Sequence, residues 1–342
     1  MKVFTSVFNS AVRQIPLPQD FSAADVDLLI VHGIRATLEY ESIQYMLQKA
    51  YPNAVITGCS TAGELEGGMI HHNSVVFAAL SFEKSEVKQV SRQFSEEDCL
   101  NEAVRDLAGQ LAREDLKGVV VYIDGLALDS DEVVCSLGEA LDPAVKVIGG
   151  LAADSLGFED AKVITRGGAF SRSVTLTGLY GDSLELTSTC SEFPASSEKM
   201  VITRSEGNMI FEIDHQPAYQ VYRLALENRG YELPRDVTYF PLMILDDLGC
   251  PLMPRSVLQC SEEAGTVLCA SAISEGSVVS ICDLSNPQLI VEDAKKVIGN
   301  CVSAETEFVL VINCVGRRIT LGPASEGEEA EVVARTAGHH LP

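Results

Sequence analysis

The chain has no tryptophan among its 342 residues, and aromatic residues make up only 6% of it. Basic residues are also scarce, because 25 Lys and Arg stand against 49 Asp and Glu, for a formal net charge of −24. Nucleic-acid backbones and anionic membrane surfaces would repel such a chain, so we expect neither as a partner. No apolar run approaches the roughly 20 residues that span a bilayer, so no membrane insertion is expected.

Paired cysteine motifs are missing as well. The ten cysteines are scattered and none forms a C-x-x-C pair, which excludes a zinc ribbon and a c-type haem attachment site. Polar residues such as Thr5 and Ser6 interrupt the N-terminal stretch, which is therefore unlike the apolar core of a secretory signal. Cysteines in apolar surroundings are typical of a reducing compartment, so we expect reduced thiols in a cytoplasmic protein.

What the chain does contain is a succession of apolar runs and amphipathic stretches. Residues 27–31 and 119–123 indicate buried strands, whereas residues 41–50, 100–111 and 131–141 show the spacing of helices. A chain of this length favours two domains. We predict an α/β protein with mixed, partly parallel sheets: a lead-in over 1–25, a first domain over 26–213 and a second over 214–342.

Two stretches of the first domain resemble copies of one strand–helix–strand unit. Gly33 and Gly125 each follow a strand and are 92 positions apart, and the same offset separates Gly58 from Gly150. The matching offset favours an internal duplication that places two glycine loops in comparable positions. A third unit has a predicted strand over 307–313 and a helix over 325–336 but no partner strand. We therefore expect a C-terminal strand to be missing, as truncation of a longer protein would explain.

The loop over residues 58–64 reads Gly-Cys-Ser-Thr-Ala-Gly-Glu and follows a predicted strand. Small residues let backbone N–H groups converge on an anion or a ligand carbonyl. Thr61 and Glu64 have the spacing of a capping box, which predicts a helical turn. The alternative is a tight turn between two core elements with no ligand.

These residues resemble the FIST proteins (F-box and intracellular signal transduction) over roughly residues 30–340. The resemblance is carried by residues 58–64, 123–126, 149–154, 205–208, 240–242 and 314–317. Two features depart from the family: Ser191-Glu192-Phe193-Pro194 stands where a glycine-tryptophan-proline stretch is usual, and the usual glycine-phenylalanine-tyrosine segment would fall after Pro342.

The resemblance implies an intracellular sensor of a small-molecule ligand rather than an enzyme. Amino acids and other small metabolites are among the ligands proposed for the family. One branch resembles nitric-oxide sensors that carry haem b and act on a histidine kinase or a cyclic-di-GMP enzyme, as in a two-component system. The resemblance thus implies one of these signalling partners. From the duplicated units we expect the glycine loops to face a ligand cleft, with the ligand bound near the domain junction.

Ten residues are candidates for the site. For ligand binding we predict Gly58, Cys59, Ser60, Thr61, Glu64, Gly149, Gly150, Asp154 and Arg317, the last as an anchor for a ligand carboxylate. His215 is the first choice for a haem axial ligand, although a turn or capping role is the alternative. Cys59 could instead be the nucleophile of an enzyme, since a thiol among N–H donors can have a lowered pKa. For Arg317 the alternative is a salt bridge to one of the many acids.

Overall fold

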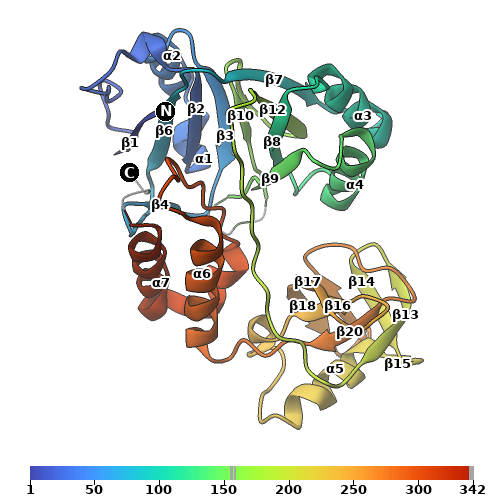
Figure 1. Ribbon diagram of the computed structural model, residues 1–342. Coiled ribbons are helices and arrows are strands. Elements are labelled where there is room, and N and C mark those ends of the chain that lie inside the picture. The colour runs from blue at the N-terminus through green and yellow to red at the C-terminus, as the bar shows by residue number, and fades with distance from the viewer. Residues whose placement is uncertain (155–156, 158, 339–342) are drawn as a thin grey trace. The chain divides into compact units, whose positions relative to one another are not determined.

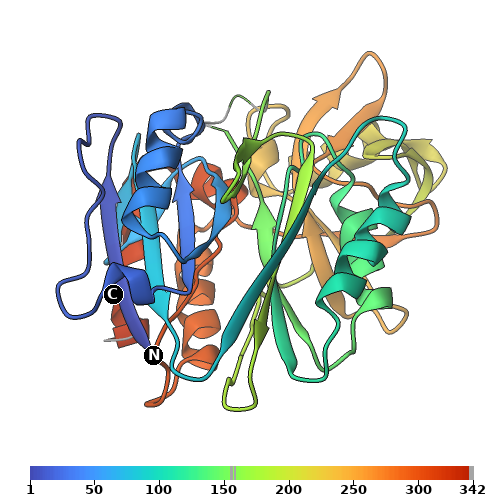
Figure 2. The same ribbon diagram turned by 90° about the horizontal axis from the view of Figure 1, so that it is seen from above.

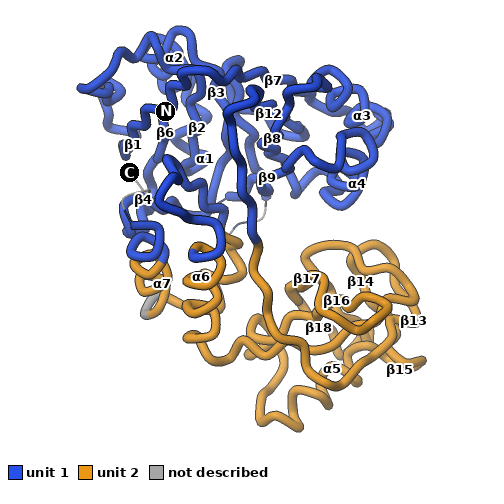
Figure 3. Tube along the Cα trace, in the orientation of Figure 1, with its two compact units in different colours: residues 1–189, 299–312, 333–342 blue, residues 190–298, 313–332 orange. Residues whose placement is uncertain are grey.

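The computed structural model describes residues 1–154, 157 and 159–338. It contains two compact units, one over residues 1–189, 299–312 and 333–342 and the other over residues 190–298 and 313–332 (Figure 3). The chain first passes from one unit to the other at residue 190, before the boundary near residue 213 that the sequence suggested. Residues 200–213 lie in the second unit because their strands pair with strands farther along the chain.

The first unit contains two mixed sheets (Figure 1). The six-stranded sheet has the order β1-β6-β2-β3-β10-β11, with β1 Lys2–Phe8, β6 Val75–Ser81, β2 Leu28–Gly33, β3 Val55–Ser60, β10 Val163–Thr165 and β11 Gly168–Phe170. The four-stranded sheet has the order β7-β12-β8-β9, with β7 Glu86–Gln93, β12 Ser173–Tyr180, β8 Leu116–Ile123 and β9 Lys146–Leu151. A short hairpin joins β4 Glu64–Glu66 and β5 Met69–His71.

Both sheets contain the same four-strand unit. In each, the first strand pairs antiparallel with the fourth, the fourth pairs antiparallel with the second, and the second pairs parallel with the third. The pairing register of the parallel strands shows which glycines are equivalent in the two units, and it differs from the prediction. Gly58 lies beside Val31, and Gly149, not Gly150, lies beside Val121 in the same way. The true offset is therefore slightly shorter than 92, and Gly33 and Gly125 are not equivalent.

Helices cover one face of each sheet, and the other two faces pack against each other. Helices α1 Arg35–Leu38 and α2 Glu41–Ala50 follow β2, and Ile43 and Leu47 of α2 join a core with Leu29, Val31 and Ile56. Helices α3 Leu100–Leu111 and α4 Ser130–Ala140 cover the second sheet (Figure 2). A third core lies between the sheets and includes Leu28, Ile30 and Cys59 of one with Val120 and Tyr122 of the other. The layers of this unit are therefore helix, sheet, sheet, helix.

The second unit is built on one eight-stranded antiparallel sheet. Its path is β17-β16-β20-β13-β14-β19-β18, with β17 Pro251–Arg255, β16 Leu242–Leu245, β20 Val278–Ile281, β13 Met200–Glu206, β14 Met209–Ile213, β19 Thr266–Cys269 and β18 Val257–Ser261; β15 Gln216–Pro217 pairs with β14. Helix α5 Ala218–Glu227 packs on this sheet through Tyr222 and Leu226. Helices α6 Pro287–Cys301 and α7 Val315–Ala337 follow, and α7 bends at Gly322. The mixed α/β fold in two domains is thus confirmed.

The strand predicted over residues 307–313 is wrong, because these residues pair with no strand among the described residues. Instead, Phe308 and Leu310 pack against the core between the two sheets, as do Leu184 and Leu186. The sequence of a short apolar run does not show whether its backbone hydrogen-bonds to a neighbouring strand or whether its side chains only cover a sheet. The described helices also include none that is both long enough and apolar enough to cross a membrane.

Candidate functional site

The carboxyl ends of the two parallel strand pairs meet in the first unit. The N–H of Ala153, just after β9, donates to the carbonyl oxygen of Ser60 at the end of β3, at 2.8 Å. The N–H of Thr61 in turn donates to the carbonyl of Gly33 at the end of β2, at 3.0 Å. The loops that follow β3 and β9 are therefore in direct contact. Such edges of α/β sheets are where ligands commonly bind, because loops and N–H groups gather there.

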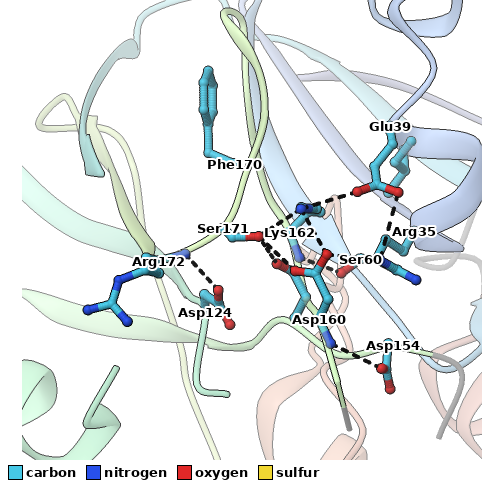
Figure 4. Close-up of polar contacts among 12 residues, drawn as sticks. Arg35, Glu39, Ser60, Asp124, Asp154, Asp160, Lys162, Phe170, Ser171 and Arg172 are labelled. Atoms are coloured by element: carbon cyan, nitrogen blue, oxygen red, sulfur yellow. Dashed lines mark hydrogen bonds and ion pairs between the residues drawn. The ribbon is translucent and has the colours of Figure 1, made fainter. Parts of the chain in front are cut away.

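Four charged side chains and one hydroxyl lie at this edge. We call these residues the Lys162 cluster: Arg35, Glu39, Asp160, Lys162 and Ser171 (Figure 4). Lys162 Nζ lies 3.0 Å from Asp160 Oδ2 and 3.2 Å from Glu39 Oε1, and it donates to Ser171 Oγ at 2.7 Å. Arg35 Nη1 donates to the same Asp160 oxygen at 2.8 Å.

Local structure explains how these residues come together. Arg35 begins the helix that follows β2, and Glu39 ends it. Lys162 directly precedes β10, which pairs antiparallel with β3, so the Lys162 N–H reaches Ser60 Oγ at 2.8 Å. Ser171 directly follows β11, the strand that forms a hairpin with β10. Three chain segments therefore supply the cluster, namely residues 35–39, residues 160–162 and Ser171.

The cluster balances its own charges. Partial burial alone would raise the pKa of Asp160, but hydrogen bonds from Ser171 and Lys162 outweigh this and lower it. Burial would likewise lower the pKa of Lys162, but the carboxylates of Asp160 and Glu39 raise it. Both groups are thus held in their charged forms near neutral pH. A ligand with opposite charges at its two ends could exchange partners with these ion pairs.

Two further carboxyl groups stand beside the cluster. Asp124, directly after β8, is buried, and its Oδ2 accepts the N–H of Arg172 at 2.7 Å. Burial raises the pKa of Asp124, although hydrogen bonds from the backbone N–H groups of Arg172 and Leu126 oppose the shift. Asp154, a predicted site residue, is also buried, and its Oδ2 accepts the N–H groups of Glu159 at 2.8 Å and Asp160 at 3.3 Å. Asp154 therefore holds the backbone of Glu159 and Asp160 in place.

The predicted glycines have a packing role. A Cβ atom on Gly58 would lie 1.8 Å from the carbonyl oxygen of Val31, and one on Gly149 would lie 1.8 Å from that of Val121. Gly58 also has a φ of 153°. Gly150 is covered by Ile312, whose Cγ2 would lie 2.8 Å from an added Cβ. Close approach between strands thus accounts for Gly58 and Gly149, and the Ile312 side chain accounts for Gly150. Ser60 and Asp154 are the predicted residues next to the Lys162 cluster.

Cys59 lies in the core between the two sheets with only 4% of its surface exposed. Burial raises the pKa of its thiol to about 12, which is opposite to the shift that a nucleophile needs. Its neighbour in the ladder, His32, shares a hydrogen bond of 2.8 Å with the Tyr122 hydroxyl, and burial lowers the pKa of His32 to about 4. Cys59 therefore does not have the setting of an activated thiol.

Thr61 and Glu64 do not begin a helix, so the predicted capping box is wrong. Thr61 Oγ1 donates to Glu64 Oε1 at 2.7 Å, and Ser74 Oγ donates to Glu64 Oε2 at 2.6 Å. Glu64 starts strand β4 instead. Burial raises the pKa of its carboxyl group, although both hydrogen bonds oppose the shift. The two residues stabilise the loop after β3.

Arg317 lies in the second unit, where its guanidinium already has carboxylate partners. Nη1 donates to Asp293 Oδ2 at 2.7 Å, Nε donates to Glu329 Oε1 at 2.7 Å, and all three side chains are at least nine-tenths buried. Nη2 donates to the Ile290 carbonyl at 2.8 Å, and the ring of Phe193 lies under the guanidinium. A ligand carboxylate would have to displace one of these partners.

The surroundings of His215 do not fit a haem. The residue is exposed in the turn between β14 and β15, with a left-handed φ of 61°, and its N–H donates to Thr203 Oγ1 at 2.9 Å. An axial ligand needs an apolar pocket around the porphyrin, and an exposed turn supplies none. In the part of the chain that the structure describes, no three His, Cys, Asp or Glu side chains gather as a metal site either.

Several residues of this site were missed by the sequence reasoning. Arg35, Glu39, Asp160 and Lys162 lie in polar stretches that show no motif, and long-range strand pairing alone brings them together. Asp124 had a usable signal, because an acidic residue directly after a buried strand is placed at the carboxyl edge of its sheet.

Comparisons with known proteins agree with the two-domain organisation. The family model described as the FIST N domain matches residues 27–216, and that described as the FIST C domain matches residues 218–342. An uncharacterized protein of Methanocaldococcus jannaschii is 25% identical over 327 residues, which covers 84% of this chain and 60% of that protein. The chain thus spans about 60% of the length of this curated relative. FIST domains are in general sensory domains that bind small ligands in signal-transduction proteins.

Proposed function

Because the chain belongs to the FIST family and has both of its domains in order, we propose that it is a cytoplasmic small-ligand sensor. The ligand binds at the carboxyl edge of the first unit, and the bound state is read by a signalling partner such as a histidine kinase or a cyclic-di-GMP enzyme. One observation carries the proposal. The loops after β3 and β9 join through Ala153 and Ser60 beside a cluster of two cations and two carboxylates.

The charges favour a small zwitterionic ligand, such as an amino acid, over haem. Arg35 and Lys162 could each pair with a ligand carboxylate, and Asp160, Glu39 and Asp124 could accept from an ammonium group. The exposed His215 gives no corresponding support to a haem, and the buried Cys59 gives none to a thiol enzyme.

Thermal unfolding in the presence of each free amino acid tests this proposal. A ligand that binds only the folded state raises the melting temperature, by an amount equivalent to about 2.7 kcal/mol when its concentration is one hundred times its Kd. We expect stabilisation by one or a few amino acids and its loss in Lys162→Met. Arg113→Met, which removes a cation from a surface ion pair of the same unit, is the matched control. Unchanged melting with all twenty, or equal responses in both variants, would contradict the proposal.

A further inference from the structure

Residues 61–74, which we call the hairpin segment, connect β3 to β6 and contain the β4–β5 hairpin (Figure 1). Both ends of the segment are attached to the chain at the end of β2. The N–H of Thr61 donates to the carbonyl oxygen of Gly33 at 3.0 Å, and the N–H of Ile34 donates to the carbonyl oxygen of Ser74 at 2.9 Å. The segment therefore starts and finishes at the same edge of the sheet.

A single buried carboxyl group joins these two ends. The side chain of Glu64 belongs to a residue that is only 3% exposed. Thr61 Oγ1 donates to Glu64 Oε1 at 2.7 Å, and Ser74 Oγ donates to Glu64 Oε2 at 2.6 Å. Glu64 thus connects the first and the last residue of the hairpin segment, and the function proposed above does not use it.

Glu64 has no permanent cation beside it. Among the residues that the structure describes, no Lys or Arg forms an ion pair with this carboxyl group. Strand β6 contains no charged residue, and the one charged residue of β1, Lys2, pairs with Ser81 at the far end of β6. Arg35, at the start of α1, pairs with Asp160 instead. Ionising a buried carboxyl group is costly without such a partner.

The other titratable groups near Glu64 belong to the hairpin segment itself. The imidazoles of His71 and His72 are close enough for their charged forms to favour the ionised carboxyl group, but burial is the larger effect and raises the pKa of Glu64. Glu66 is two residues farther along β4, and its Oε2 lies 3.5 Å from His71 Nε2. Its Oε1 accepts from Thr5 Oγ1 of β1 at 3.5 Å. Glu64 is therefore the one carboxyl group of the segment that is enclosed by the fold.

We propose that the hairpin segment is a pH-dependent element, which stays closed when Glu64 is neutral and opens locally more often when Glu64 is ionised. Opening exposes the carboxyl group to water, which solvates a negative charge better than two hydroxyl groups do. The neutral acid donates its own O–H to one hydroxyl oxygen and accepts from the other hydroxyl, so the two ends of the segment remain joined. The inference goes beyond the proposed function, because it concerns proton binding rather than a ligand.

The sign of the pH dependence follows from the geometry. The closed segment binds the Glu64 proton more tightly than the open segment does, because only the closed segment buries the group. The stabilisation of the closed form is therefore complete at low pH, and it is lost as the pH rises through the pKa of Glu64 in the closed form.

Hydrogen exchange of the full chain between pD 5.0 and 7.5, corrected for the intrinsic exchange rate, tests the inference. We expect the protection of the amides of residues 64–71 to fall several-fold as the pD rises. The β10–β11 hairpin of the same unit, over residues 163–170, has no buried carboxyl group and is the internal reference. Its protection should not change in this range.

Variants assign the effect to Glu64. Glu64→Gln keeps the shape and cannot ionise, so the protection of residues 64–71 should no longer depend on pD. Glu66→Gln removes the other carboxyl group of the segment and should retain the wild-type dependence. The double variant His71→Asn, His72→Asn removes the imidazoles that favour ionisation, so the fall in protection should move to higher pD.

A wild-type protection that is constant or rises with pD would overturn the inference, as would an unchanged pD dependence in Glu64→Gln. The carboxyl carbon shift of Glu64 in the wild type gives a second measurement, in case Glu64→Gln does not fold. If Glu64 titrated together with the exposed Glu83, the inference would also be wrong. Neither experiment uses a ligand, so this inference and amino-acid binding at the carboxyl edge can fail independently.

Discussion

At the scale of single residues, Gly58 and Gly149 are the positions that the fold constrains most tightly. Each lies in the third strand of its unit, directly against a carbonyl oxygen of the second strand. The sequence marked both as loop residues that face a ligand. Their real contact is with the neighbouring backbone, so they set the distance between strands whose ends carry the site.

Replacing Gly58 or Gly149 by alanine should therefore be severely destabilising. The added Cβ would overlap a backbone oxygen that cannot move without breaking the ladder, and we expect a loss of more than about 3 kcal/mol, or no folding. Urea unfolding measures the effect.

Gly109→Ala and Gly138→Ala are the controls for this prediction. Both glycines lie inside helices where an added Cβ meets nothing within 4 Å. These substitutions should stabilise the protein by about 0.5–1 kcal/mol. Wild-type stability in Gly58→Ala would contradict our account of the strand contact.

His32 makes stability depend on pH. Burial lowers its folded-state pKa to about 4 from a model-peptide value of 6.5, so the unfolded chain binds the proton more readily. This contribution is present above pH 6.5 and is lost as the pH falls towards 4, with a full size of roughly 3 kcal/mol. We expect the free energy of unfolding to fall more steeply between these pH values in the wild type than in His32→Asn.

The difference in pH dependence between the wild type and His32→Asn reports on His32 alone, because carboxylates that titrate in the same range contribute equally to both proteins. His215→Asn, at an exposed turn that suits asparagine, should retain the wild-type slope. Identical slopes in wild type and His32→Asn would show that His32 is not desolvated in the folded state.

At the scale of elements, the sequence predicts amphipathic helices most accurately and the long-range pairing of strands least accurately. Helices α2 and α3 have the bounds that their apolar spacing predicted, since that signal lies within a single element. The pairing of β3 with β10 joins residues about one hundred positions apart, and no local pattern reports it. The Lys162 cluster depends on that pairing, which is why the sequence identified Ser60 but missed Lys162 and Asp160.

Helices α6 and α7 are connected through the buried Arg317, which pairs with Asp293 of α6 and Glu329 of α7. Arg317→Met would leave two buried carboxylates without a cation, so we expect a loss of about 3–5 kcal/mol in urea unfolding. The triple variant Arg317→Met, Asp293→Leu, Glu329→Leu should recover much of this loss, because no charge remains buried.

Arg223→Met is the matched control for the ion-pair prediction. Arg223 forms an exposed pair with Glu227 one helical turn away, and such pairs contribute little. A small effect of Arg317→Met, similar to that of Arg223→Met, would mean that water reaches the Arg317 carboxylates.

At the scale of the whole molecule, the charge of −24 opposes the compact state. Salt shortens the range of repulsion between like charges, from about 30 Å at 0.01 M to about 8 Å at 0.15 M. We therefore expect the melting temperature to rise between these NaCl concentrations. Choline chloride, with a cation too bulky for specific carboxylate sites, should act similarly. A falling melting temperature would show that attractive ion pairs outweigh the net repulsion.

The hydrogen bond between His32 and Tyr122 has a consequence for the ancestry of the first unit. The two residues hold equivalent positions in the two strand–helix–strand units, whose equivalent faces pack together. In a symmetric pair of separate, identical chains, each of these positions would face a copy of itself, His against His or Tyr against Tyr. Joining both copies in one polypeptide allows them to diverge into a matched hydroxyl and imidazole, so the present chain holds a contact that an identical pair could not make.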